Sequence, residues 1–439
     1  METARGISSG LVTLVFSVVV LCSVSVHINA KELSYTSIEM PALSQEQQKA
    51  VSAYAERLLL NSISATKITL NKSEAQSTFS DTTGVELGVL RTADNEHVYH
   101  WLTPIYAFDC SNLPSSCTPN SGSQPIKVGV VYVTLKKNKG ADLLAEELSE
   151  LLSVYKTTNV FLEDAEDVMS KLLPRYPEIL LDYGTISLVG KLDADTSDLW
   201  VIADHIPLFS ELSERGKVEG IAADLVRDIL FEVDRPSDIL SAPWIRIAKE
   251  AMSKSNVLVF SVVRTEERDD VFHWVTPVSR NLHGLFGINK PYFDSLNDVP
   301  KSYKVGTLLN DYRYNVALDN GFNVRAYESW HDLVEAVFKE EIDVLFGSQG
   351  AVDFGCDPKA FNCEMIKLTG KYDVSTAYLA LSKKDTCLLV LEKLKLAAVT
   401  VRKSDKYNQQ LATWSEKVER DHGIAHHTEN GVVHLWNTN

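Results

Sequence analysis

Two arginines placed directly after a strand-like run are the residues of this chain best suited to chemistry. The run, residues 257–263, is apolar apart from one serine, and Arg264 and Arg268 follow it. Open α/β sheets bind their ligands at the carboxyl ends of strands, so both side chains are candidates for a binding site. A guanidinium group offers a carboxylate two parallel, charge-assisted hydrogen bonds. The arrangement therefore predicts a site for an anionic group.

The stretch that carries these arginines occurs twice. Residues 264–278 and residues 91–105 both contain Arg-Thr, His-Trp and Thr-Pro at the same spacing, but the first copy has Asn95 where the second has Arg268. We interpret the chain as a tandem duplication of a ligand-binding module whose N-terminal copy has lost its anion anchor. Because the first arginine of the motif is kept in both copies, we expect it to position the turn.

Short apolar strands alternate with helices in both halves, which is typical of βαβ units in a parallel sheet. Each half has a strand that begins Lys-Val-Gly, then an acidic amphipathic helix, then an apolar strand that ends in glycine. These segments start at Lys127, Glu163 and Glu178 in the first half, and at Lys304, Glu328 and Glu341 in the second. Both halves are therefore predicted to be α/β structures.

The second half has further elements. Strands are expected at residues 199–203 and 377–381, and helices at residues 222–233, 244–253, 387–402 and 405–419. The last strand and the last two helices form a return segment for which the first half shows no counterpart. The first module is therefore predicted to be incomplete.

The N-terminus and the composition indicate an exported, soluble protein. Residues 1–30 combine a single basic side chain, an apolar run and small or polar residues at the end, the pattern of a cleaved secretory signal peptide. The apolar run is short for a permanent membrane anchor. The net charge of −16 disfavours nucleic acid and anionic membranes as partners.

Four cysteines form two pairs with the same spacing. Cys110 and Cys117 lie in a loop rich in serine and proline, and Cys356 and Cys363 lie in a second polar loop. In an oxidising compartment each pair is expected to form a disulfide that closes a small loop. Cys387, in an apolar run, is expected to be a buried thiol.

Residues from about 198 to 420 resemble the family 3 bacterial solute-binding proteins, the exported receptors of polar amino-acid ABC importers and related sensors. The resemblance rests on Gly-Lys-Val-Glu-Gly at residues 216–220, Pro243-Trp244 before a helix, and the Arg-Thr-Glu-Glu-Arg motif with Thr-Pro after it. It implies a periplasmic-binding-protein-like fold, in which two α/β lobes are joined by crossing strands and hold the ligand in the cleft between them.

The resemblance also implies ligand contacts from the first lobe. The family's Thr-x-x-Arg pattern matches Thr265 to Arg268, and its arginine clamps the ligand carboxylate. Thr265 can add a hydroxyl group, and Ser261 or Val262 a backbone group. The alternative is that Arg268 only pairs with Glu267 or Asp269 on a solvated turn.

The second lobe is expected to contribute the loop that follows its Lys-Val-Gly strand. In the family this loop supplies amides and hydroxyl groups, and here it contains Asn310, Asp311 and Tyr312. The family's aspartate for the α-amino group is replaced by Ser348. This departure disfavours an ordinary α-amino acid and leaves a carboxylate or another small polar solute.

These features divide the chain into a signal peptide (1–30), a degenerate module (31–195), a solute-binding domain (196–420) and a polar tail (421–439). The tail is expected to be loosely held. It contains the histidines His422, His426, His427 and His434. A histidine cluster can take a transition metal, but a solvated tail without metal is the simpler interpretation.

The predicted function is that of a periplasmic, monomeric, non-enzymatic solute-binding protein without cofactor. It would pass a small polar, carboxylate-bearing solute to an ABC transporter or a membrane sensor. One alternative is a sensory or partner-docking protein, and another is an enzyme such as a dehydratase on the same scaffold. An enzyme needs a general acid or base in the cleft, for which the candidates are Glu266, Glu267, Asp311 and His273.

Overall fold

The computed structural model describes residues 32–66, 68–73, 84–110, 118–119, 127–138, 141–192, 196–206, 208–235, 238–309, 311–422 and 426–436. The expected signal peptide, Cys117 and Asn310 lie outside these residues. Within the described ranges, no helix is both long and apolar enough to cross a bilayer.

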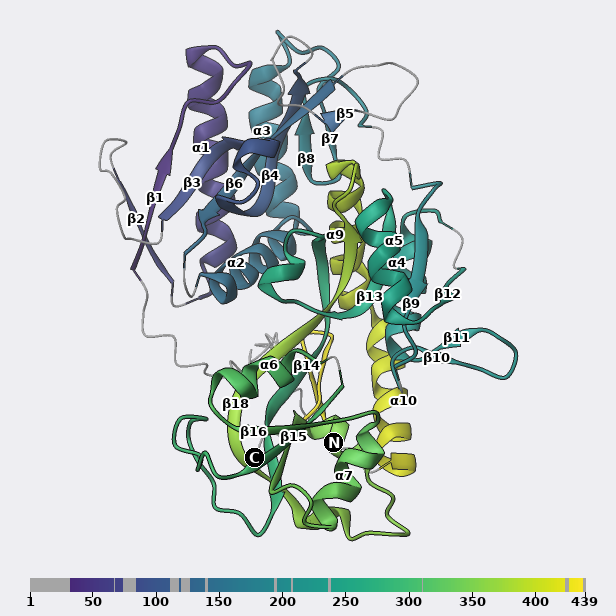
Figure 1. The fold of residues 1–439 in the computed structure, drawn as a ribbon. Helices are drawn as coiled ribbons and strands as arrows, with labels where there is room; N and C mark the ends of the chain where they lie inside the picture. Colours follow the sequence, from purple (N-terminus) through teal and green to yellow (C-terminus); the bar gives the residue numbers. More distant parts are fainter. Residues whose placement is uncertain are drawn as a thin grey trace, which may run out of the picture.

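The second half of the chain is built on one continuous mixed sheet with the strand order β12-β9-β13-β18-β14-β17-β15-β16. Two long strands at its centre, β14 (Phe272–Ile288) and β18 (Ile366–Ser382), pair antiparallel along their length. The other strands attach at one end or the other of this pair, so that the sheet carries two lobes (Figure 1). The two-lobed α/β fold with crossing strands is confirmed.

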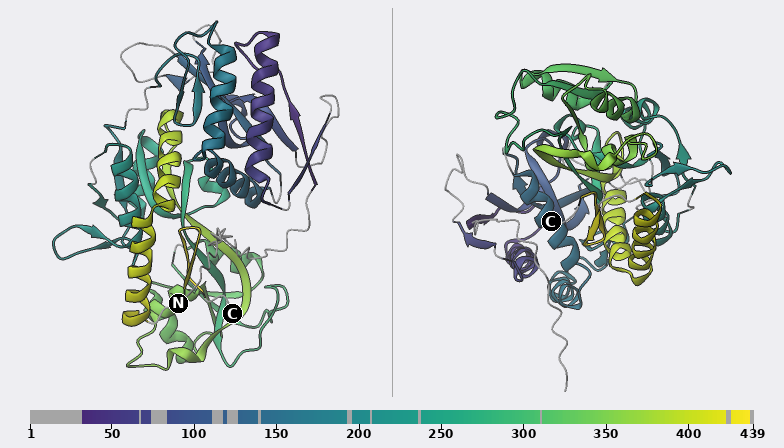
Figure 2. Two further views of the ribbon diagram at one scale, coloured as in Figure 1. Left: turned by 180° about the vertical axis from the view of Figure 1, so that it is seen from behind. Right: turned by 90° about the horizontal axis from the view of Figure 1, so that it is seen from below.

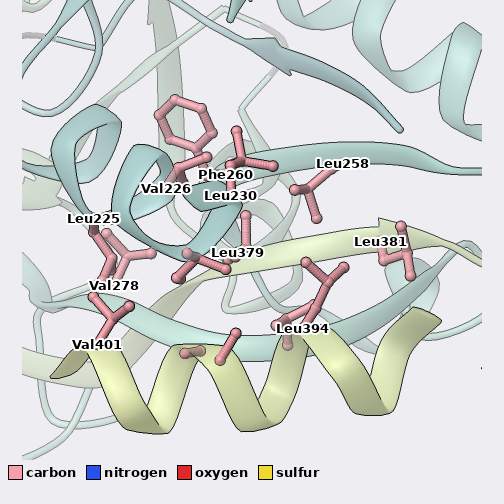
Figure 3. Packing of buried hydrophobic residues seen from close by; sticks show 14 of the residues in the cluster. Leu225, Val226, Leu230, Leu258, Phe260, Val278, Leu379, Leu381, Leu394 and Val401 are labelled. Atoms are coloured by element: carbon pink, nitrogen blue, oxygen red, sulfur yellow. The ribbon is translucent and has the colours of Figure 1, made fainter. Parts of the chain in front are cut away.

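The first lobe has helices on both faces of its sheet. Leucines, valines and Phe260 are buried between α4, α9 and the strands (Figure 3). The expected helices and the first strand are present with nearly the expected ends. The lobe comprises β9 (Trp200–Ala203), β10 (Glu211–Leu212), β11 (Val218–Glu219), α4 (Ile221–Glu232), β12 (Leu240–Ser241), α5 (Trp244–Ser253), β13 (Val257–Val263), η2 (Glu266–Arg268), α9 (Leu388–Lys403) and α10 (Asp405–His422).

The second lobe contains three parallel strands, because β15 runs parallel to both β16 and β17. Its helices are short, and each begins at a residue whose side chain accepts a hydrogen bond from the first turn: Asp311, Ser329 and Ser348. The elements are β15 (Lys304–Leu308), α6 (Tyr312–Asp319), β16 (Asn323–Tyr327), α7 (Trp330–Phe338), β17 (Val344–Ser348), α8 (Gln349–Gly355) and η3 (Cys363–Met365).

The first half forms a separate sheet in the order β2-β1-β3-β6-β4-β8-β7, with β5 paired to β6. It lies beside the first lobe (Figures 1 and 2). The elements are β1 (Glu32–Ser37), α1 (Gln45–Ile63), β2 (Thr69–Lys72), β3 (Gly84–Leu90), η1 (Ala93–Asn95), β4 (Tyr99–Asp109), β5 (Thr118–Pro119), β6 (Lys127–Lys136), α2 (Asp142–Tyr155), α3 (Asn159–Leu172), β7 (Leu180–Asp182) and β8 (Thr185–Ser187).

The position of β6 corrects the expected match between the halves. The Lys-Val-Gly pattern matches β6 with β15, yet β6 lies between β3 and β4, antiparallel to both. In the second half, β18 holds this place between β13 and β14. The helices α2 and α3 then follow β6 as α9 and α10 follow β18. The first half therefore does contain a return strand and a helix pair. What its described residues lack is a counterpart of the second lobe.

The end of the chain forms a hairpin, so the expectation of a loosely held tail is wrong. β19 (His427–Glu429) and β20 (Val432–His434) pair antiparallel, and β20 runs parallel to β14 at Ser279 and Arg280. Both valines of β20 are buried. In the first half, the hairpin β7–β8 lies against β4 in the same way. The halves share this arrangement, while a duplication of one module remains a hypothesis.

The two halves also share a hydrophobic core, because β6 is apolar on both faces. Successive side chains of a strand point to opposite faces. Val131 and Val133 belong to the core of the first half. Val130 and Tyr132 belong to the core of the first lobe, which contains α4 and α9. The contact between the halves is therefore a packed apolar interface.

A buried lysine at the end of α2 should make the stability depend on pH. The Nζ atom of Lys156 donates to the Pro104 carbonyl at 2.8 Å, and burial lowers the lysine's pKa from 10.5 to about 7. Between these values the unfolded chain binds more protons than the folded one, so stability rises with pH. We expect urea melts to show this rise from about pH 7 towards 10, and Lys156→Met to flatten it. An unchanged profile in the variant would contradict the assignment.

The cysteine chemistry of the described residues gives a second test. Cys356 and Cys363 form the expected disulfide. Cys110 is disulfide-bonded, and its expected partner Cys117 lies outside the described residues. Cys387 remains a thiol and is half-buried. We expect alkylation of exported protein without reductant to modify Cys387 alone, as judged by mass spectrometry. Reaction of all these cysteines would rule out both disulfides, each of which contributes about 2–3 kcal/mol through its short loop.

Candidate functional site

A cavity of about 190 Å³ lies at the carboxyl end of β13 in the first lobe. It is enclosed by the end of β9, the start of α5, and β13 with the turn that follows it. Each of these segments contributes a side chain with a polar atom. The side chains that matter for its chemistry are Asp204, Trp244, Ser261 and Arg268, and Ile206 and Ile247 add apolar wall.

Ser261 is held in an unusual backbone conformation at this cavity. Its φ angle of 60° is one that L-residues rarely adopt, and the pairing of β13 with β18 shifts register between Val259 and Val262. Bulges of this kind occur next to active sites, where they re-aim a side chain. The Ser261 Oγ atom is buried and has no hydrogen-bond partner among the residues that the structure describes. A buried hydroxyl group without a partner costs free energy, so Ser261 is suited to receive a ligand.

Arg268 closes the same cavity from the turn η2. Its Nη1 atom donates to the Val263 carbonyl at 2.7 Å, and its guanidinium lies 4.6 Å from the ring centre of Trp244. Burial lowers the pKa of Arg268, which shows that the charge is partly removed from water. Within the described chain Arg268 makes no ion pair, and Asp269 pairs with Arg264 instead. The alternative of a solvated pair with a neighbouring carboxylate is therefore not what the structure shows.

Asp204 is a site residue that sequence reasoning missed. It follows β9 directly and lines the cavity together with Arg268. Burial raises the pKa of Asp204, and a hydrogen bond from the His205 backbone opposes this shift in part. The signal was available in the sequence, since Asp204 is the first charged residue after a buried strand, at the sheet edge where ligands bind.

The start of α6 in the second lobe does not line this cavity. Asp311, Glu267 and Tyr312 act electrostatically on Arg268 and oppose the lowering of its pKa by burial. Asp311 is also held within its own lobe, where Arg313 donates to both carboxylate oxygens at 2.7 and 2.6 Å. Burial alone would raise the pKa of Asp311, but these bonds keep it below its ordinary value. Asp311 is therefore a charged, oriented carboxylate.

The remaining predicted residues lie outside the cavity or outside the described residues. Thr265 begins η2 but does not line the cavity. Ser348 is buried and caps α8 by accepting a hydrogen bond from the Ala351 amide at 3.2 Å. Asn310 is not among the described residues. Of the predicted residues, the structure places Ser261 and Arg268 on this cavity, whereas Asp311, Tyr312, Thr265 and Ser348 are not among its lining residues.

Arg264 has the positioning role expected from its presence in both copies. It donates to the two carboxylate oxygens of Asp269 at 2.9 and 3.1 Å. In the first half, Arg91 binds Glu96 in the same way at 2.8 and 2.7 Å. Both pairs span five residues and lie against a tryptophan of the motif. The Arg264 guanidinium is therefore occupied by its hydrogen bonds to Asp269 within the turn.

The corresponding place in the first half is filled. Gly88 lies at the equivalent bulge of β3, with φ of 109°, and a Cβ atom there would be 2.7 Å from the Cγ atom of Met40. Ile38 follows β1 where Asp204 follows β9. Asn95 replaces Arg268 and donates to the Leu90 carbonyl at 2.9 Å. The polar groups of the second-half cavity are thus absent, and Met40 occupies their space.

A second cavity, of about 160 Å³, lies between the two halves and is lined by ion pairs. Lys383 and Arg91 both contact Glu96, at 3.1 and 2.7 Å. His273 lies here, with its Nδ1 atom 3.3 Å from Arg91. Burial and the nearby Arg91 hold the pKa of His273 well below its ordinary value. This cavity belongs to the interface between the halves rather than to the site at β13.

The chain matches no protein-family model and no curated protein. Solved structures resemble it at low identity. A histidine kinase sensor domain with similarity to periplasmic binding proteins has 14% identity over 50% of this chain and 97% of its own, with a TM-score of 0.42. An ancestral arginine-binding protein bound to arginine has 19% identity, coverage of 50% and 99%, and a TM-score of 0.40.

A third similar structure is an amino acid ABC transporter substrate-binding protein from Streptococcus pneumoniae, bound to L-arginine. It has 16% identity over 49% of this chain and 94% of its own, with a TM-score of 0.39. At this identity and TM-score we draw no conclusion about function from the matches. The strand order and crossing strands of the second half themselves define a two-lobed, periplasmic-binding-protein-like fold.

Proposed function

We propose that this chain is an exported, non-enzymatic solute-binding protein whose site is the cavity at the end of β13. The observation that carries the proposal is the unpartnered, buried Oγ atom of Ser261 beside Arg268 and Asp204 in one cavity. Orphaned polar groups are costly in a folded protein unless a ligand satisfies them. The compartment would be the periplasm, reached through the signal peptide at residues 1–30.

The charges of the cavity indicate the kind of solute. A carboxylate on the solute would accept paired hydrogen bonds from Arg268. Asp204, on another wall, suits a cationic or hydrogen-bond-donating group on the same molecule. The ring of Trp244 and the two isoleucines suit a short apolar part. A small polar solute with a carboxylate and a donor group meets these demands, and Asp204 replaces the acidic contact that Ser348 cannot provide.

Closure of the lobes would complete the site. Asp311 and Tyr312 lie at the start of α6 in the second lobe, and closure would bring this segment onto a solute held by Arg268. Such closure is how the resembling family holds its ligands. An ABC transporter or a membrane sensor would then bind the closed complex.

The positions of the candidate acids and bases favour binding over catalysis. Glu266 and Glu267 are exposed on η2. Asp311 is bound to Arg313, and His273 lies in the interface cavity against Arg91. Asp204, the acid that lines the site, has no base beside it among the lining residues. A general acid and base pair poised over one ligand atom is therefore lacking among the described residues of this cavity.

A thermal-shift screen of the mature protein tests the proposal. Amino acids, dicarboxylates, polyamines and small sugars would be added singly, and the melting temperature recorded. A ligand at a hundredfold excess over its Kd stabilises the folded state by about 2.7 kcal/mol. We expect stabilisation by a solute that carries both a carboxylate and a donor group. Stabilisation only by sugars or polyamines would contradict the role of Arg268.

A further inference from the structure

The C-terminal hairpin places three metal-binding side chains on one of its faces. His427 and His434 are directly opposite each other in the register of β19 and β20, and Glu429 lies two residues from His427. Alternate residues of a strand share a face, and opposite residues are close neighbours. One ligand atom from each of the three side chains lies within 4.8 Å of the others.

The turn of the hairpin holds this register. Asn430 and Gly431 have φ angles of 51° and 74°. A two-residue turn with positive φ at both positions matches the twist of a hairpin and fixes which residues face each other. The opposition of His427 and His434 is therefore set by the backbone, independently of any ion.

The tautomer of His427 is fixed by a hydrogen bond on its far side. Its Nδ1 atom lies 2.8 Å from the Trp436 carbonyl oxygen. A carbonyl oxygen can only accept, so Nδ1 carries a proton, and in the neutral ring the lone pair is therefore on Nε2. Metal-binding histidines use this same arrangement, in which the second ring nitrogen donates to a backbone carbonyl.

His434 is also prepared for ligation. Its Nε2 atom faces Glu429, whose carboxylate oxygen is 4.0 Å away. Arg280, which pairs with His434 in the register of β14 and β20, forms an ion pair with Glu146 at 3.2 Å. The positive charge beside the cluster is thus balanced.

We propose that His427, Glu429 and His434 form a site for a divalent transition metal such as Zn²⁺. Two histidines and one glutamate are a known zinc ligand set that leaves one coordination position open. Ligand atoms at about 2.1 Å from zinc are about 3.4 Å apart in a tetrahedron. The side chains therefore need to approach each other only slightly. Ni²⁺ and Cu²⁺ favour the same nitrogen donors.

The place of the site in the fold gives the metal a structural effect. β20 pairs with β14 at Ser279 and Arg280, between the segments of β14 that serve the two lobes (Figure 1). Leu435 continues this contact, since its amide donates to the Arg280 carbonyl at 3.0 Å. A metal that ties β19 to β20 would hold the hairpin against this crossing strand. Zn²⁺ is therefore expected to raise the melting temperature.

Calorimetric titration of mature, untagged protein with Zn²⁺ tests the site. We expect one ion per chain in the wild type. His427→Ala and Glu429→Gln should each weaken the affinity at least tenfold, because loss of even a supporting contact to a metal ligand costs about tenfold to a hundredfold. Both positions are partly exposed, so the variants should fold, and melting without metal would check this. His97→Ala, at an exposed histidine of the first half, should bind as the wild type does.

Co²⁺ gives a second, spectroscopic measurement. Bound by these three ligands with one open position, it should show the visible absorption of four-coordinate cobalt in the wild type and in His97→Ala, and not in His427→Ala. The proposal is overturned if the wild type takes up no stoichiometric Zn²⁺. It is equally overturned if the His427 and Glu429 variants bind Zn²⁺ with unchanged affinity.

Discussion

Arg268→Ala is expected to weaken solute binding by about thirtyfold to several thousandfold, which corresponds to about 2–5 kcal/mol. The guanidinium lines the cavity over the ring of Trp244, and burial lowers its pKa. It forms no ion pair with another described residue. Removing it would leave the solute carboxylate buried without a partner. The fold should be retained, because the side chain lines the cavity and its hydrogen bond within the described residues is to the Val263 carbonyl.

The matched control is Asn95→Ala, at the equivalent turn of the first half. Asn95 makes only local hydrogen bonds, to Thr92 and Leu90, and its module has Met40 in place of a cavity. Solute affinity should stay at the wild-type value. Calorimetry with the solute found by the screen would measure both variants. Wild-type affinity in Arg268→Ala would mean that the solute is anchored elsewhere, with Asp204 the next candidate because Arg264 is occupied by Asp269.

Removal of the first half is expected to destabilise the second half by several kcal/mol. Val130 and Tyr132 of β6 belong to the core of the first lobe, and each large apolar side chain of a core contributes about 1.5–3 kcal/mol. The interface also holds the ion pair of Glu150 with Arg402 at 2.9 Å. A whole domain is stable by only about 5–15 kcal/mol. A fragment that begins at residue 196 should therefore aggregate or melt well below the full chain.

Size-exclusion chromatography and thermal melting of the fragment provide the measurement. A separately produced first half, residues 32–195, is the control, because adding it should restore a single folded complex with a higher melting temperature. The fragment could instead melt at the temperature of the full chain and not bind the added first half. The shared core would then contribute little to stability, and the halves would be independent domains.

The second half was predictable because its signals are local. The periodic apolar residues of α4, α5, α9 and α10 define helices without reference to partners. The strand end at Val263 likewise located Ser261 and Arg268. The length of the crossing strand β18 is underestimated, because the sequence predicts a strand only at residues 377–381. The rest of that strand is formed by pairing with β14, which no local pattern encodes.

Partners that lie far apart in the chain explain the errors. The Lys-Val-Gly pattern of β6 indicates a strand but not its neighbours, and β6 pairs with β3 and β4 rather than taking the place of β15. The hairpin at residues 427–434 looks polar, yet it covers an edge of β14 that only the folded sheet exposes. Asp204 was missed because one charged residue after a strand is not a motif by itself.

The filled cavity of the first half has a consequence for signalling. Met40 lies against Gly88 where the second half has its cavity, and a ligand can shift only an equilibrium between states that it binds differently. Through β6 the first half is fixed to the first lobe, so these two parts should keep one shape with and without solute. A partner that docks on them would find a constant surface. If the proposed solute binding is signalled to a partner, we expect the position of the second lobe to carry that information.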